Sequence, residues 1–249
     1  TTQGFDVNVA GKSWGSPSGG GYHSPYKYPN LENKEKGEYL TDRLGVEACK
    51  FIETNKDKPF FLYLTHYAVH TPIQAKPELK KKYQAKKPTE RHKNPSYAAM
   101  IESTDDSVGA VLATLDRLEL ADDTIVIFFS DNGGHGGVTS NAPLRGSKGM
   151  LYEGGIREPM IVKWPGVTKS GSICRENVIG IDIYPNIDEI SLHFGSQRDE
   201  RNLSGTIDLN NNHWHRMHLG LTEHAGGGCL VDVSVTPDVR GAAGSPVLF

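Results

Sequence analysis

The chain has 249 residues, of which 37% are hydrophobic, and this is enough for one α/β domain with a core. Its 27 basic and 30 acidic side chains leave a net charge of −3, which gives no global reason to bind nucleic acid or a membrane surface. No apolar run reaches membrane-spanning length, so we expect no membrane span. The three cysteines, at unrelated spacings, predict neither a disulfide framework nor a zinc site.

The amino-terminal part predicts one step of an α/β sheet. Residues 1–37 are rich in Gly, Ser, Pro and Tyr without an apolar period, so we expect irregular surface structure there. From Glu38 apolar residues recur at helical spacing, and the helix is expected to end near Asn55. A short apolar strand over residues 59–64 follows, and a helix leading into a strand is typical of an α/β sheet.

A basic stretch comes next. It contains Lys76, Lys80, Lys81, Lys82, Lys86, Lys87, Arg91 and Lys93, with only Glu78 and Glu90 against them. We interpret this stretch as a solvated loop or helix face. The alternative is a docking surface for an anionic polymer.

A long helix is expected after the basic stretch, with Ser96 as its N-cap. Its apolar stripe consists of Tyr97, Met100, Ile101, Thr104, Val108, Val111, Leu112, Leu115 and Leu118. Such a stripe indicates core packing. Asp105 and Asp106 adjoin on this helix and cannot face one partner, so we expect them to brace a neighbouring loop rather than to ligate a metal.

The segment DTIVIFFSDNGG, residues 123–134, carries the most chemical information. Its apolar run, residues 125–129, lacks polar alternation, which predicts a strand covered on both faces in a parallel or mixed sheet. Asp131 and Asn132 follow at the carboxyl end, where ligands gather in such sheets. Their hard oxygen atoms suit Ca²⁺ or Mg²⁺ better than zinc. The alternative is a simple turn, because Asp-Asn-Gly-Gly is good turn chemistry.

After a glycine-rich loop to Gly155, strands are expected over residues 160–164 and 178–183, and Pro185 is expected near the start of another helix. Beyond Asn186 the apolar periodicity is lost, as a shifted reading frame, a mis-joined sequence or disorder would produce. We therefore divide the chain into an irregular segment 1–37, a central domain part 38–186 and an irregular tail 187–249. The tail's histidine cluster is interpreted as accidental rather than as a metal site: His213, His215, His218 and His224.

Five segments, taken together and in this order, resemble the sulfatase family. They are Tyr63-Leu-Thr-His-Tyr-Ala-Val-His70-Thr-Pro72, Tyr97-Ala-Ala-Met-Ile-Glu-Ser-Thr-Asp105-Asp-Ser-Val-Gly109, Ser130-Asp-Asn-Gly133, Leu144-Arg-Gly-Ser-Lys148-Gly and Glu153-Gly-Gly-Ile-Arg157-Glu-Pro159. The resemblance implies an alkaline-phosphatase-like α/β fold, a mixed sheet flanked by helices, present here as a partial domain. It also implies a sulfuric ester hydrolase that cleaves sulfate esters at a calcium site, with Mg²⁺ less favoured.

The resemblance also assigns roles to individual residues. It makes Asp131 and Asn132 the metal ligands, Lys148 the cation that contacts the sulfate, and His70 the active-site histidine. An imidazole can donate to sulfate oxygens or protonate a leaving alkoxide, because it titrates near neutrality. His66 is expected to be structural.

Two residues of the glycine-rich region are assigned from their surroundings. Arg157 is expected to pin its loop through a neighbouring carboxylate, Glu153 or Glu158. His135 follows the glycines and is expected to line the pocket.

One feature of the family pattern is absent from this sequence. Sulfatases of this type attack with a formylglycine made in a Cys/Ser-x-Pro/Ala-x-Arg motif, but no cysteine here has proline two residues on, and Ser16-Pro17-Ser18 lacks the required order. The chain begins at Thr1 without a leader, so we expect an interior piece that is inactive alone, with the formylglycine in a preceding part. The resemblance further implies a periplasmic or secreted protein whose partner is a sulfated small molecule or a sulfated polysaccharide.

Two alternative functions remain open. A phosphodiesterase-like enzyme of the same superfamily would need a similar arrangement of metal and cations. A non-catalytic remnant could instead bind anionic glycans through residues 76–93.

Overall fold

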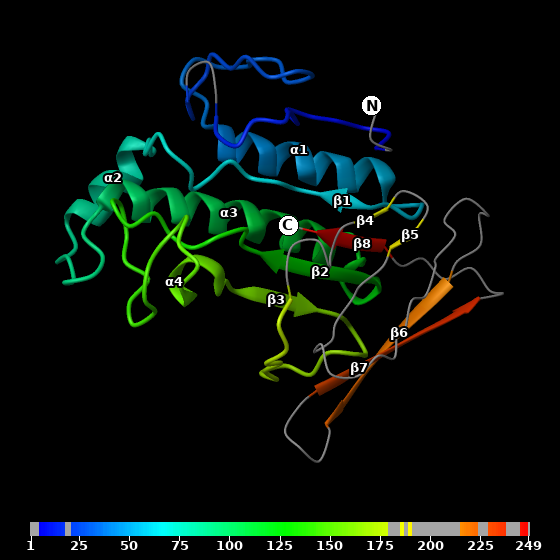
Figure 1. Cartoon of the computed structure of the whole chain (residues 1–249). Helices are drawn as coiled ribbons and strands as arrows, with labels where there is room; N and C mark the ends of the chain where they lie inside the picture. The colour runs from blue at the N-terminus through cyan, green and yellow to red at the C-terminus, as the bar shows by residue number, and fades with distance from the viewer. Residues whose placement is uncertain are drawn as a thin grey trace. The chain divides into compact units, whose positions relative to one another are not determined.

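A computed structural model of the chain describes residues 5–17, 21–178, 185–186, 189–190, 215–223, 229–237 and 245–248 (Figure 1). The chain forms two units, one of Asn8–Lys163 with Gly244–Phe249 and one of Thr1–Val7 with Trp164–Ala243. The first unit contains every residue that the sequence nominates for catalysis or metal binding. None of the described helices is both long and apolar enough to cross a membrane.

The first unit is built on a four-stranded mixed sheet in the order β1-β8-β2-β3. Its strands are β1 (Leu62–Tyr63), β8 (Ser245–Leu248), β2 (Thr124–Phe129) and β3 (Met160–Lys163). Strand β8 is parallel to both β1 and β2, whereas β3 pairs antiparallel with β2. Strands β1 and β2 therefore point the same way, and the loops that leave their carboxyl ends emerge at one edge of the sheet. The mixed α/β sheet predicted from the sequence is confirmed.

Helices α1 (Leu40–Asn55) and α3 (Pro95–Arg117) pack side by side along this sheet (Figure 1). The spacing of Leu40, Leu44, Ala48 and Ile52 gives α1 one fully buried face, as the sequence predicts. A short helix, α2 (Pro77–Gln84), forms within the basic stretch and has no buried residue. A 3₁₀ turn, η1 (Ala121–Asp123), precedes β2, and α4 (Glu153–Ile156) lies in the glycine-rich region.

The amino terminus of α3 differs from the prediction. Asn94, not Ser96, is the N-cap, and its Oδ1 accepts from Ser96 N at 3.0 Å and Tyr97 N at 3.1 Å. Pro95 occupies the first helical position, where its missing N–H costs nothing. Because the proline starts the helix one residue before Ser96, the cap falls on the asparagine.

The buried face of α3 also differs from the apolar stripe. Ile101 is 48% exposed, whereas Ser103 and Ser107 are buried against α1. Ser103 satisfies its hydroxyl by donating to Ala99 O, 3.2 Å away, so its burial leaves no unpaired donor. The facing position on α1 is Gly45, where an added Cβ would lie 2.3 Å from Ser107 Oγ. Close approach of the two helices selects small residues, and this shifts the buried face away from the largest side chains.

The amino-terminal segment is irregular, as expected, but it does not form only surface. Tyr22 has no exposed area, and Tyr26, Tyr28 and Leu31 are also buried in the core cluster with α1 and α3. Tyrosine makes this possible because it contributes a large apolar ring to the core, and the hydroxyls of Tyr22 and Tyr26 donate to backbone carbonyls. The segment is therefore one wall of the core.

The carboxyl-terminal part contains strands that the sequence did not indicate. In the second unit β4 (Pro185–Asn186) pairs with β5 (Glu189–Ile190), and β6 (His215–Glu223) pairs with β7 (Cys229–Pro237). Pro185 is thus in a strand, not near a helix start. These strands and β8 differ from the expected irregular tail, while the domain boundary at residue 186 stays a prediction. The strand expected over residues 178–183 lies outside the described residues apart from Val178.

The contact between α1 and α3 can be tested with one substitution. Gly45→Ala should destabilise the fold, because overpacking costs about 1–3 kcal/mol and the gain in helix propensity recovers only about 1 kcal/mol. Ser107 cannot simply turn aside, since its Oγ also contacts His66 Nε2 at 3.2 Å. The matched control is Gly109→Ala on α3, where nothing lies within 4 Å of the added Cβ. Urea unfolding should show the control unchanged or more stable; equal stability of both variants would contradict the close helix contact.

Candidate active site

His70 lies on the loop after β1, and a buried tyrosine holds that loop. The hydroxyl of Tyr22 lies 2.6 Å from Tyr67 O and 2.8 Å from His70 O, so its single proton is shared between two backbone carbonyls. Tyr22 N donates to Gln74 Oε1 at 2.9 Å, which fixes the far end of the same loop. Burial raises the pKa of Tyr22 far above its usual range, so the hydroxyl stays a donor. No motif surrounds Tyr22, so this role could not be predicted from the sequence.

The ring of His70 has a defined orientation. Its Nδ1 lies 2.9 Å from Thr71 O and 3.2 Å from Thr71 Oγ1. A carbonyl oxygen can only accept, so in the neutral ring Nδ1 carries the proton and Nε2 keeps the lone pair. The side chain is partly exposed, and an imidazole held in this way can take up or release a proton at Nε2.

His66, four residues earlier, is in a different environment. Its Nε2 contacts Ser107 Oγ on α3 at 3.2 Å, and its Nδ1 is buried without a hydrogen-bond partner among the described residues. Burial lowers the pKa of His66 to about 4, so the ring is neutral at neutral pH. A neutral ring wedged between the strand exit and α3 fits the structural role expected for His66.

Asp131 and Asn132 follow the carboxyl end of β2, as predicted, and their side chains meet. Asn132 Nδ2 donates to Asp131 Oδ2, while the Asp131 side chain is exposed. A second carboxylate is close by: burial raises the pKa of Glu158, and the charge of Asp131 raises it further. Glu158 comes directly before Pro159, whose carbonyl accepts from Ser130 N at 3.3 Å. The sequence nominated Glu158 only as a partner for Arg157.

The loops around this motif touch through their backbones. Gly133 N donates to Gly155 O at 3.1 Å, and a Cβ on Gly133 would lie 2.0 Å from Gly154 O. A Cβ on Gly155 would lie 2.1 Å from Met150 O. No side chain fits at these positions, so Ser-Asp-Asn-Gly and Glu-Gly-Gly-Ile need their glycines for close backbone approach.

Lys148 lies at the tip of a tight turn in the same loop. Gly146 and Gly149 flank it with positive φ values of 85° and 84°, which glycine adopts without strain. Lys148 N donates to Gly134 O at 3.1 Å, so the turn is tied to the loop after Asp131 and Asn132. The Lys148 side chain is exposed.

Asn141 organises this loop, although the sequence did not single it out. Its Oδ1 accepts from Gly134 N at 3.0 Å, and its Nδ2 lies 2.9 Å from Gly134 O and 3.4 Å from Gly146 O. One side-chain amide thus replaces the strand partner that Gly134 lacks, and it draws in the turn that carries Lys148.

The structure places His70, Asp131, Asn132 and Lys148 on loops at the carboxyl edge of parallel strands β1 and β2. Among the described residues no hydrogen bond or ion pair joins His70 or Lys148 to the Asp131–Asn132 pair. The described part of the chain also contains no group of three or more His, Cys, Asp or Glu side chains arranged to hold a metal.

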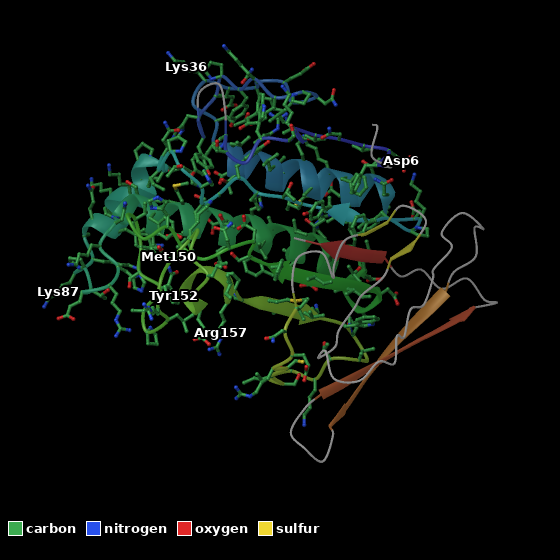
Figure 2. All side chains as sticks on the ribbon, in the orientation of Figure 1. Asp6, Lys36, Lys87, Met150, Tyr152 and Arg157 are labelled. Atoms are coloured by element: carbon green, nitrogen blue, oxygen red, sulfur yellow. The ribbon has the colours of Figure 1, made fainter. Side chains whose placement is uncertain are left out.

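The arginines of the glycine-rich region contact side chains of the same region. Arg157 pairs with Glu153, with 3.6 Å between Nη1 and Oε2, as expected, and both side chains are 63% exposed. Such an exposed pair contributes at most about 1 kcal/mol. Arg145 donates to the hydroxyl of Tyr152 at 3.0 Å, and its guanidinium lies 3.8 Å from the centre of that ring. Figure 2 shows Tyr152 and Arg157 beside α4.

The structure also locates the remaining candidates. Asp105 and Asp106 are exposed on α3. His135 is exposed, and its Nδ1 accepts from Gly137 N at 3.0 Å, so its ring closes a local turn. Of the tail cluster, His213 and His224 lie outside the described residues, and His215 and His218 fall on β6.

The mixed sheet with α1 and α3 along it defines an α/β protein. Comparisons with known proteins narrow this class. The sulfatase family profile matches residues 2–189. A sulfatase from Formosa agariphila is 42% identical over 166 residues, which are 62% of this chain and 30% of that protein. Arylsulfatase J of Mus musculus is 34% identical over 239 residues, 89% of this chain and 37% of that protein.

A solved structure agrees with these relatives. The crystal structure of Ps i-CgsB in complex with k-i-k-neocarrahexaose matches with a TM-score of 0.56 at 36% identity, over 66% of this chain and 36% of that one. The chain belongs to the sulfatase family, and its fold is part of the alkaline-phosphatase-like domain. It spans about a third of the length of the curated relatives it matches.

The role of Asn141 can be tested with an isosteric change. Asn141→Asp keeps the acceptor for Gly134 N but replaces the donor that faces Gly134 O and Gly146 O with a repelling carboxylate. Exchange of the Lys148 amide should accelerate about 10- to 100-fold, because losing such a bond costs about 1–3 kcal/mol. Hydrogen exchange followed by NMR measures this.

Asn8→Asp is the matched control. Asn8 makes the same two contacts in another loop, to Gly11 O at 3.1 Å and from Gly11 N at 2.8 Å. It should leave exchange at Lys148 unchanged. Unchanged exchange at Lys148 in both variants would show that Asn141 does not hold the turn.

The burial of His66 predicts a dependence of stability on pH. Its folded pKa of about 4 lies below the unfolded value of about 6.5, so the fold favours the neutral ring. The stability that the fold gains from the neutral His66 ring is complete above pH 6.5. As the pH falls towards 4, the free energy of unfolding decreases by roughly 3 kcal/mol. His66→Gln, which cannot take up a proton, should lose less stability over this window. Urea unfolding at pH 7, 5.5 and 4.5 checks this, and identical losses in parent and variant would refute it.

Proposed function

We propose that the protein to which this chain belongs hydrolyses sulfate esters at the carboxyl edge of β1 and β2. The observation that carries the proposal is that three family-like segments far apart in sequence, which contain His70, the Asp131–Asn132 pair and Lys148, lie on loops at this one edge. Family membership supports the reaction class. A sulfate ester needs stabilisation of the negative charge on the sulfuryl and departing oxygens, and fixed cations provide this best.

Calcium is the proposed metal, with magnesium less favoured, and the donor set fits it in part. Asp131 and Asn132 offer hard oxygen atoms, and Asn132 turns its Nδ2 towards Asp131, which leaves its Oδ1 free to bind a cation. Burial raises the pKa of Glu158 most, and the charge of Asp131 adds to this, a repulsion that a divalent cation would relieve. Calcium takes about 6–8 oxygen ligands, so others must come from outside this set. When bound, the ion would supply fixed positive charge beside the sulfuryl oxygens.

Lys148 and His70 are the proposed catalytic residues of this chain. Lys148 would bind a sulfate oxygen as a point charge, and its position is fixed by the glycine turn and by Gly134 O. His70, with its Nδ1 proton turned to Thr71 O, would first take up a proton at Nε2 and then donate it to the departing alkoxide, which returns the ring to its neutral form. Poor leaving groups depend most on such a donor.

The nucleophile is not provided by the motifs described above. Cys49 is partly buried on α1 and Cys174 is exposed, and neither stands in a Cys-x-Pro/Ala-x-Arg sequence. By family membership we expect a formylglycine elsewhere in the complete protein, and we expect this chain alone not to turn over. Export to the periplasm or the extracellular space is the matching proposal for location.

The proposal is tested by kinetics of the complete protein on an aryl sulfate. Lys148→Ala should cost about 2–4 kcal/mol of transition-state stabilisation, or roughly 30- to 1,000-fold in kcat/KM. Lys163→Ala, an exposed lysine on β3, removes the same charge and should change little. Asp131→Ala should abolish the response of activity to calcium. Cleavage of phosphate diesters but not of sulfate esters by the parent would instead identify a phosphodiesterase.

A further inference from the structure

The basic stretch of residues 76–93 contains two kinds of cationic side chain. Two lysines are neutralised within the first unit: Lys76 pairs with Asp42 at 2.8 Å, and Lys82 pairs with Glu102 at 2.5 Å. Lys80 and Lys93 are exposed and make no ion pair with any described residue. An exposed, unpaired cation keeps its full charge for a ligand.

Lys80 and Lys93 line the same depression. It has a volume of about 550 Å³, is open to solvent, and lies between α2, the start of α3 and the loop at Gly137 and Val138. Gln84 and Ser96 add polar groups to its wall, while Pro95 and Val138 add apolar surface. The amides at the start of α3 are not available, because Asn94 Oδ1 already accepts from two of them. Attraction of an anion to this depression must therefore come from the two lysines.

The depression is continuous with the loop that carries the candidate site. Arg91 Nη1 donates to Ala142 O at 3.3 Å, and His92 Nδ1 lies 3.2 Å from Thr139 Oγ1, so the basic loop is attached to the glycine-rich loop. That loop holds Lys148 through Gly134 O. Gly137 and Val138 of this loop also line the depression.

We propose that the depression lined by Lys80 and Lys93 binds a second sulfate group of the substrate, so the substrate class is a sulfated oligosaccharide or polysaccharide rather than a monosulfated small molecule. This rests on the proposed function. Mixed polar and apolar walls suit a sugar ring, whose hydroxyls and C–H faces need both, and the lysines suit its sulfate. A single exposed cation attracts a sulfate group only weakly. Two lysines that act on the same saccharide chain together strengthen its binding.

The test is binding of a sulfated hexasaccharide to the intact chain, measured by calorimetry at two salt concentrations. Lys80→Ala with Lys93→Ala should raise Kd about three- to tenfold and reduce the effect of salt. The control is Lys36→Ala with Lys58→Ala, which removes the same charge; both lysines are exposed, and Lys36 lies well apart from Lys87 and α4 in Figure 2. The control should change Kd less than twofold, and a neutral hexasaccharide should not bind.

Activity separates this proposal from the proposed function. In the complete protein the double variant Lys80→Ala with Lys93→Ala should raise KM for the sulfated hexasaccharide and leave kcat/KM for a small aryl sulfate unchanged. The complete protein could hydrolyse both substrates while the double variant and its control bind the sulfated hexasaccharide with the same Kd. That result would overturn the second-sulfate site and leave the proposed function standing. Binding that depends on Lys80 and Lys93 without any hydrolysis would overturn the proposed function and support the depression as a glycan site.

Discussion

The carboxyl edge of the sheet depends on one constraint, which is that the loops leaving β1 and β2 have no strand partner for their backbone groups. Buried or half-buried N–H and C=O groups must still be paired. Tyr22 does this for the first loop through Tyr67 O and His70 O, and Asn141 does it for the second through Gly134 and Gly146. Two side chains outside the named catalytic groups therefore set where His70 and Lys148 can be.

The second loop adds a steric constraint to this polar one. Gly133, Gly154 and Gly155 approach other backbone atoms so closely that no Cβ fits. The family-like segments Ser130-Asp-Asn-Gly133 and Glu153-Gly-Gly-Ile therefore need glycine partly because there is no space for a side chain. Their glycines let the chain fold back on itself beside the ligand-bearing residues. A match to a family motif in this region therefore indicates a particular backbone arrangement as well as a set of reactive side chains.

The sequence predicted elements whose signal is local and missed contacts whose partners are distant. The period of Leu40, Leu44, Ala48 and Ile52 specifies α1, and the apolar run at residues 124–129 specifies β2. The burial of Tyr22 could not be found in this way, because it depends on a loop 45 residues away. The same holds for Glu158 beside Asp131, which the antiparallel pairing of β2 with β3 brings together.

Behind the candidate site, buried His66 and Tyr22 stay neutral and the loops carry the ions. Burial keeps His66 uncharged and the hydroxyl of Tyr22 protonated, whereas Asp131 and Lys148 are exposed on the loops. Exposed charges are screened over roughly 8 Å at physiological salt, so each acts only on groups it nearly touches. A polyanionic ligand held at this edge would therefore need separate cations for separate anionic groups. The attachment of the basic loop to the glycine-rich loop at Ala142 and Thr139 supplies cations beyond Lys148 without carrying any charge into the core.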